Sequence, residues 1–168
     1  LKVVQMMLSS LERSWSAALT TALRAETVVT LKSVEQAAFG AYREALPEGV
    51  LFGALSVGTL PGTSFIGVPA SFALAAVDRM AGGRGVVPNE VRSLSDIELY
   101  IVRKMFDQLA VDLGAAMRPV IGLAVSVSGF YRSVDEIEMG DREVVLVGDF
   151  DWSTPSGEHK ISLVIPGS

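Results

Sequence analysis

The sequence repeats its own pattern, and this repeat restricts the folds that the chain can adopt. Each half contains a long helix pattern, strand patterns, a turn with proline, and a last strand that ends in proline and two small residues. The ending Ile66-Gly67-Val68-Pro69-Ala70-Ser71 has its echo in Leu163-Val164-Ile165-Pro166-Gly167-Ser168. We interpret the echo as a duplication, with pseudo-repeats at about 3–85 and 93–168. Helices that alternate with strand pairs predict an α/β fold of three layers, α/β/α, with pseudo-two-fold symmetry.

Hydrophobic periodicity gives the expected elements. It predicts helices over 3–24, 39–46, 70–81 and 95–118, and strands over 27–31, 50–57, 64–68, 120–127, 143–150 and 160–165. A Pro-Gly turn is expected at 59–63 and another turn at 153–157. Ser95 and Glu98 form a capping box at the start of the last helix, and Pro119 is expected to stop it. Trp15, Met105 and Phe106 lie on long helices, as core residues or on a contact face.

The apolar helix near the middle of the chain ends in a glycine loop. Its stripe includes Phe72, Ala76 and Met80, and its only charges, Asp78 and Arg79, come late in the helix. One glycine after the helix is enough to end it. The segment Gly82-Gly83-Arg84-Gly85 has three, which leaves a backbone that a partner can approach closely. A flexible connector is the alternative interpretation of the same residues.

Composition narrows the range of functions. A chain of 168 residues is expected to form a single domain, 1–168. Its net charge of −5, from 14 basic and 19 acidic residues, and the lack of a basic cluster argue against nucleic acid as a partner. Hydrophobic residues make up 49%, yet no run approaches the roughly 20 residues that span a bilayer. We therefore expect no membrane insertion, and apolar surface that lies between subunits. The start at Leu1 suggests a fragment of a longer protein.

Catalytic and metal-binding patterns are sparse. The sequence has no cysteine, and its one histidine, His159, is expected to be exposed on a hairpin. The acidic segment 135–143 is expected to be a solvated loop, because its spacing does not match an EF-hand. The glycine segment lacks the Lys-Ser/Thr of a phosphate-binding loop. We therefore expect no metal, no cofactor and no catalytic residues.

Several segments, in order along the chain, resemble the middle domain of the flagellar motor switch family FliM, which is related to the CheC/CheX/FliY phosphatases. These segments are Ser33-Val34-Glu35-Gln36 with Tyr42, then 55–62, 76–85, 94–98 and 162–166. The resemblance covers nearly the whole chain, and the ordered set is more specific than any one segment.

The resemblance implies a CheC-like fold and a non-enzymatic role as a switch element in the cytoplasmic ring of the flagellar rotor, on the cytoplasmic face of the inner membrane. It implies that Gly82, Gly83, Arg84 and Gly85 contact the rotor protein FliG, with Arg84 in place of the proline common in the family. Neighbouring FliM copies are the other implied partners. Phosphorylated CheY and FliN are further implied partners through parts of the parent chain, and the resemblance leaves open whether phosphorylated CheY also contacts this domain.

The related phosphatases suggest an alternative function, hydrolysis of CheY phosphate by a Glu-x-x-Asn pair on a long helix. Two glutamates stand at suitable places, Glu12 and Glu98. The residues three positions later are Trp15 and Ile101, whose side chains cannot orient a water molecule. The sequence therefore favours a ring component over a phosphatase.

Overall fold

The computed structural model describes residues 1–58, 60–90, 92–121 and 124–167. Its helices are α1 (Lys2–Ser9), α2 (Leu11–Leu23), α3 (Phe39–Ala45), α4 (Ala70–Met80) and α5 (Asp96–Ile121), with a short 3-10 helix, η1 (Val134–Glu136). Its strands are β1 (Val28–Ala38), β2 (Val50–Val57), β3 (Ser64–Pro69), β4 (Val125–Tyr131), β5 (Val144–Thr154) and β6 (Gly157–Pro166). None of the helices in these ranges has the length and apolar content needed to cross a membrane.

The strands of the described residues form one antiparallel sheet whose order reflects the repeat in the sequence. The order is β1-β5-β6-β3-β2-β4. When each strand of the first half is exchanged for its counterpart (β1 for β4, β2 for β5, β3 for β6), the order reads the same from the opposite edge. The approximate two-fold axis therefore lies between β6 and β3. This agrees with the predicted pseudo-two-fold fold, while the repeat boundaries at 3–85 and 93–168 stay a prediction.

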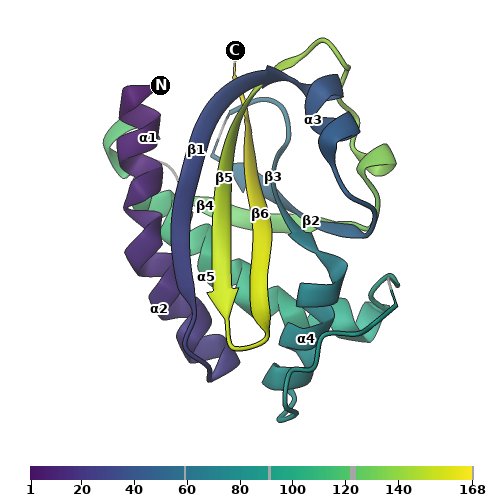
Figure 1. Cartoon of the computed structure of the whole chain (residues 1–168). Coiled ribbons are helices and arrows are strands. Elements are labelled where there is room, and N and C mark those ends of the chain that lie inside the picture. The colour runs from purple at the N-terminus through teal and green to yellow at the C-terminus, as the bar shows by residue number, and fades with distance from the viewer. Residues whose placement is uncertain (59, 91, 122–123, 168) are drawn as a thin grey trace.

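Helices cover the two faces of the sheet unequally (Figure 1). The helices α1, α2, α4 and α5 pack on one face and bury the larger core. The short helix α3 covers part of the other face, where Phe39 and Tyr42 pack with Phe65 and Val164 in a smaller cluster. The layers follow the predicted α/β/α order, with one thick and one thin helical layer.

The larger core is centred on Trp15. Its indole Nε1 donates a buried hydrogen bond of 3.2 Å to the carbonyl of Leu109, which ties α2 to α5. Its ring lies 5.0 Å from Phe150 between centroids. Trp15, Met105 and Phe106 are all buried, so they belong to the core and the alternative of a contact face is wrong for them.

Two glycines let helices sit directly on the sheet. A Cβ on Gly53 of β2 would lie 2.6 Å from the ring of Phe106, on α5. A Cβ on Gly148 of β5 would lie 3.0 Å from the side chain of Leu8, on α1. Since β2 and β5 are counterparts in the repeat, each half uses a glycine to admit a helix of the other half.

Helix side chains cover backbone groups at both edges of the sheet. On β1, the amides of Val29 and Leu31 donate to Ser16 Oγ (2.9 Å) and Glu12 Oε2 (2.8 Å) of α2. On β4, the carbonyl of Val127 accepts from Arg103 of α5 at 2.9 Å. Each half thus covers backbone groups of its outer strand with side chains of its own long helix, by acceptors on β1 and by a donor on β4.

The structure differs from several predicted boundaries. The first helix is interrupted at Ser10, whose hydroxyl donates to the carbonyl of Met7 and so competes with the helix. Strand β1 continues to Ala38 because pairing with β5 overrides the weak β propensity of its second part. Helix α5 runs past Pro119 to Ile121, so the predicted stop at this proline is wrong; a proline so close to the end of a helix disturbs only the last turn.

Two further predictions lie partly outside the described residues. The strand predicted over 120–127 begins at Val125, and residues 122–123 of the prediction are not described. The predicted Pro-Gly turn includes residue 59, which is likewise outside, while Gly62 has the positive φ of 88° that such a turn requires.

The close approach of α5 to the sheet can be tested with Gly53→Ala. The added methyl group would press into the buried ring of Phe106, and such overpacking typically costs about 1–3 kcal/mol. We expect the melting temperature to fall by several degrees, measured by circular dichroism. Gly129→Ala is the matched control, because a Cβ on this β4 residue meets nothing within 4 Å. Equal melting temperatures for the two variants would contradict the packing argument.

Candidate functional site

The glycine loop lies at the surface directly after α4. Gly82 and Arg84 are exposed, Gly83 is half-buried, and Gly85 is buried. Gly82 and Gly85 have positive φ values of 99° and 76°, a conformation that favours glycine. The structure therefore brings the four predicted residues together in one turn, with Gly85 facing inward.

Asp78, in the last turn of α4, holds the loop in place. The amide of Gly83 donates to the backbone carbonyl of Asp78 at 2.7 Å, and the amide of Gly85 donates to its carboxylate at 2.9 Å. A Cβ on Gly83 would collide with that carboxylate. A side chain at Gly83 would therefore displace the carboxylate that binds the amide of Gly85, whereas a Cβ on Gly82 meets nothing within 4 Å.

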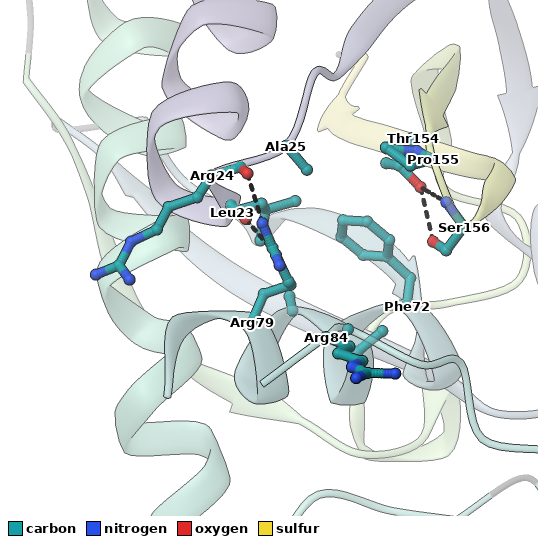
Figure 2. A pocket seen from close by; sticks show the side chains of 12 residues that line it. Leu23, Arg24, Ala25, Phe72, Arg79, Arg84, Thr154, Pro155 and Ser156 are labelled. Atoms are coloured by element: carbon teal, nitrogen blue, oxygen red, sulfur yellow. Dashed lines mark hydrogen bonds between the residues drawn. The ribbon is translucent and has the colours of Figure 1, made fainter. Parts of the chain in front are cut away.

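Arg79 connects the loop to the end of α2 (Figure 2). Its Nε donates to the carbonyl of Leu23 at 2.7 Å, and one terminal nitrogen donates to the carbonyl of Arg24. These carbonyls belong to the last turn of a helix, where intrahelical donors run out. The other terminal nitrogen lies 3.4 Å from the carbonyl of Gly83. A Cβ on Gly85 would meet the aliphatic part of the Arg79 side chain, so packing within the chain also favours glycine at this position.

A cavity of about 330 Å³ opens beside the loop, and we call it the loop cavity. Three segments meet around it: the end of α2, the inner face of α4 with the loop, and the turn between β5 and β6 (Figure 2). Its lining residues are Leu23, Arg24, Ala25, Phe72, Ala75, Ala76, Arg79, Arg84, Gly85, Thr154, Pro155 and Ser156.

The prediction that His159 is exposed is wrong. Its side chain is buried, with 8% exposed, and its ring lies 4.8 Å from that of Phe72. The residue pairs with Trp152 in the β5–β6 register, and side chains of β6 alternate between the two faces. His159 therefore shares the helix-covered face with Ile161. Burial lowers the pKa of its imidazole, so the ring is neutral at neutral pH.

Sequence reasoning missed the functions of Asp78 and Arg79 in the loop. The available signal was that they are the only charges in an otherwise apolar helix. The residues described by the structure contain no group of three His, Asp or Glu side chains arranged to hold a metal ion. The site is accordingly a shaped surface of backbone, arginines and an apolar cavity.

The hydrogen bond between Asp78 and the loop predicts a measurable change in Asp78→Ala. Loss of the acceptor should speed amide hydrogen exchange at Gly85 by about 2–10-fold, the range expected for one hydrogen bond. Exchange is measured residue by residue by NMR. Asp107→Ala, on the exposed side of α5, is the control and should leave Gly85 unchanged. Identical exchange in both variants would show that Asp78 does not hold the loop.

Comparisons with known proteins now identify the relatives of this chain. The family model described as flagellar motor switch protein FliM matches residues 1–166. The curated FliM of Bacillus subtilis (strain 168) is 23% identical over 145 residues, which cover 86% of this chain and 44% of that protein. The chain thus spans less than half the length of this relative.

Solved structures share the fold. A chain of the FliG–FliM complex from H. pylori superposes with a TM-score of 0.92 at 20% identity, covering 98% of this chain and 91% of that chain. Thermotoga maritima FliY superposes with a TM-score of 0.78 at 15% identity, covering 99% and 87%. These likenesses confirm the expected CheC-like fold. Because the family model matches almost the whole length of this chain, the chain belongs to the flagellar motor switch protein FliM family.

Proposed function

We propose that this chain is a structural and switching component of the cytoplasmic ring of the flagellar rotor, and that it binds FliG through the loop Gly82-Gly83-Arg84-Gly85. The proposal depends on the geometry of the loop. Asp78 holds the loop through a hydrogen bond to the amide of Gly85, and Gly82 and Arg84 are exposed. The similar fold in a FliG–FliM complex from H. pylori supports the choice of partner.

The contributions of the loop residues differ. Gly83 and Gly85 lack side chains because Asp78 and Arg79 occupy the space, so these glycines shape the turn. Gly82 and Arg84 are the exposed members and form the contact surface. Arg84, in place of the usual proline, adds a charged donor for an acidic group of the partner.

The wider role includes contacts with neighbouring FliM copies and relay of the chemotaxis signal at the cytoplasmic face of the inner membrane. Large apolar side chains exposed on α5, at Ile97 and Tyr100, support the existence of such contacts, because exposed apolar surface is typical of interaction sites. For phosphorylated CheY and FliN, we propose binding through parts of the parent chain.

The phosphatase alternative lacks the required side chains. The carboxylate of Glu12 accepts the amide of Leu31, and that of Glu98 is engaged by Arg92 at 2.8 Å and by the amide of Ser95 at 2.9 Å. The bond from Ser95 to Glu98, together with that from the amide of Glu98 to Ser95 Oγ at 3.2 Å, confirms the predicted capping box. Hydrogen bonds from Arg92 lower the pKa of Glu98 to about 2.

The water-orienting amide of a Glu-x-x-Asn pair is also missing. The single asparagine of the sequence, Asn89, precedes α5. Trp15 is buried in the core at the position where one such pair would need its amide.

FliG binding is tested by isothermal titration calorimetry. The FliG protein of the same organism is titrated with the variants Gly82→Asn and Arg84→Glu, and the affinity of each is compared with that of the unmodified chain. Asparagine tolerates positive φ better than other residues with a side chain, so Gly82→Asn adds a side chain to the contact surface with less backbone strain than other substitutions. We expect each variant to weaken binding by about tenfold or more, as for central interface residues. Arg13→Glu on the exposed side of α2 is the control and should bind normally. Unchanged affinity in both loop variants would remove the loop from the interface.

Phosphatase activity is tested by adding the chain to phosphorylated CheY and following the release of phosphate. We expect the rate of spontaneous phosphate loss to stay the same, since neither Glu12 nor Glu98 is followed three residues later by an asparagine. A dependence of the rate on the concentration of the chain would revive the phosphatase alternative.

A further inference from the structure

The single histidine of the chain packs against aromatic side chains where the β5–β6 hairpin meets α4. His159 belongs to β6, lies opposite Trp152 of β5, and is only 8% exposed. Its ring lies 4.8 Å from that of Phe72, on α4, between centroids. The ring of Phe72 in turn lies 5.4 Å from that of Trp152, in an edge-on arrangement. His159 is therefore part of the contact by which the turn end of the hairpin packs on α4.

The polar atoms of this contact are not paired. Nε2 of His159 is buried and has no hydrogen-bond partner among the described residues. Nε1 of Trp152, the residue opposite in the ladder, is likewise buried without a partner in that part of the chain. A protonated imidazole would bring an unpaired charge into an apolar contact, and a buried charge without a partner is costly. The charged ring therefore favours any arrangement that returns it to water.

The charged groups of the two strands lie on the other side of the sheet. Glu158 and Lys160 flank His159 on β6, so the alternation of side chains directs them to the opposite face. Asp151 of β5 pairs with Lys160 there at 2.6 Å. Asp149, two residues before Asp151, lies on that face as well. Neither β5 nor β6 therefore brings a carboxylate to the imidazole.

The charged groups on the helical side are also engaged elsewhere or exposed. Asp78 and Arg79 lie in the last turn of α4, where Asp78 binds the loop and Arg79 binds the end of α2. On α2, Glu12 accepts an amide of β1 and the terminal Arg24 is exposed. Arg84, on the loop, is exposed too. The contact between the hairpin and α4 thus depends on a histidine that stays neutral.

We infer that protonation of His159 releases the turn end of the β5–β6 hairpin from α4, which makes this contact sensitive to mild acid. The turn contributes Thr154, Pro155 and Ser156 to the lining of the loop cavity, and α4 contributes Phe72 (Figure 2). The same release therefore opens the loop cavity between these two elements. It is a property of the chain by itself and needs no partner.

The direction of the pH effect follows from the two states of the hairpin. Burial lowers the pKa of the His159 imidazole from its ordinary value of 6.5 in the packed state, and the ring regains that value when it is released. The packed state is therefore fully stable above pH 6.5 and loses stability as the pH falls from 6.5 through the lowered pKa. Burial raises the pKa of Asp112 and of Asp149, so their protonation favours the folded chain and acts in the opposite direction.

The test compares the unmodified chain with His159→Phe and His159→Gln, which keep a ring or a polar group but do not titrate near neutral pH. Amide hydrogen exchange is followed by NMR between about pH 5.5 and about pH 7.5, where histidine titrates, and is corrected for the intrinsic effect of pH on exchange. Asp149→Asn is the matched control, because it removes a titratable group from the opposite face of the same hairpin. The ring signals of His159 are followed in the same samples, and they are unambiguous because the chain has one histidine.

Lowering the pH across this range should raise the opening equilibrium of residues 151–160 several-fold, up to about tenfold, because a released histidine has a pKa of about 6.5. Exchange in β2, which β3 separates from the hairpin, should change much less. Asp149→Asn should respond like the unmodified chain, whereas His159→Phe and His159→Gln should lose the response. If His159→Phe does not fold, His159→Gln decides.

Three results would overturn the inference. A midpoint of the His159 ring titration at or above the ordinary histidine value would show that burial does not hold the ring neutral. A response that persists in His159→Phe and in His159→Gln would assign the pH effect to another group. An equal response in β2 would show that the domain unfolds as a whole and that the hairpin end is not released separately.

Discussion

The joining of the end of α2 to α4 and one wall of the loop cavity depend on the hydrogen bonds of one guanidinium group. Arg79 donates to carbonyls at the end of α2 and also approaches a carbonyl of the loop. A planar group with donors in a fixed fork suits this task, and a lysine could not make the same set of bonds. Arg79 thus links two helix ends that are far apart in the sequence, the end of α2 and the end of α4 that leads into the loop.

The elements that could be predicted from the sequence are those specified by neighbouring residues. The capping box of Ser95 and Glu98 is local and is present as expected. The buried strands β2 and β3 and the helix α4 follow from short apolar patterns close to their predicted ranges. The second part of β1 could not be predicted in this way, because its pairing partner, β5, is more than a hundred residues away. The burial of His159 was predictable in principle from the alternation along β6.

The candidate site was only partly accessible from the sequence. The glycine loop stood out, but its residues were treated as equivalent, whereas only Gly82 and Arg84 are exposed. That difference depends on where the side chains of Asp78 and Arg79 point, which periodicity does not specify. The loop cavity could not be predicted from the sequence, because the segments that line it, α2, α4 and the β5–β6 turn, are distant in the sequence and meet only in the folded chain.

The covered strand edges affect how such domains behave when they are crowded. Helix side chains already occupy two amides of β1 and one carbonyl of β4. Unpaired strand edges are templates on which further chains add, and this hazard grows with local concentration. At these positions, copies that lie close together therefore do not pair through their strand edges into an extended intermolecular sheet. The covering side chains come from α2 and α5. The same two helices therefore stabilise the single domain and limit edge pairing between crowded copies.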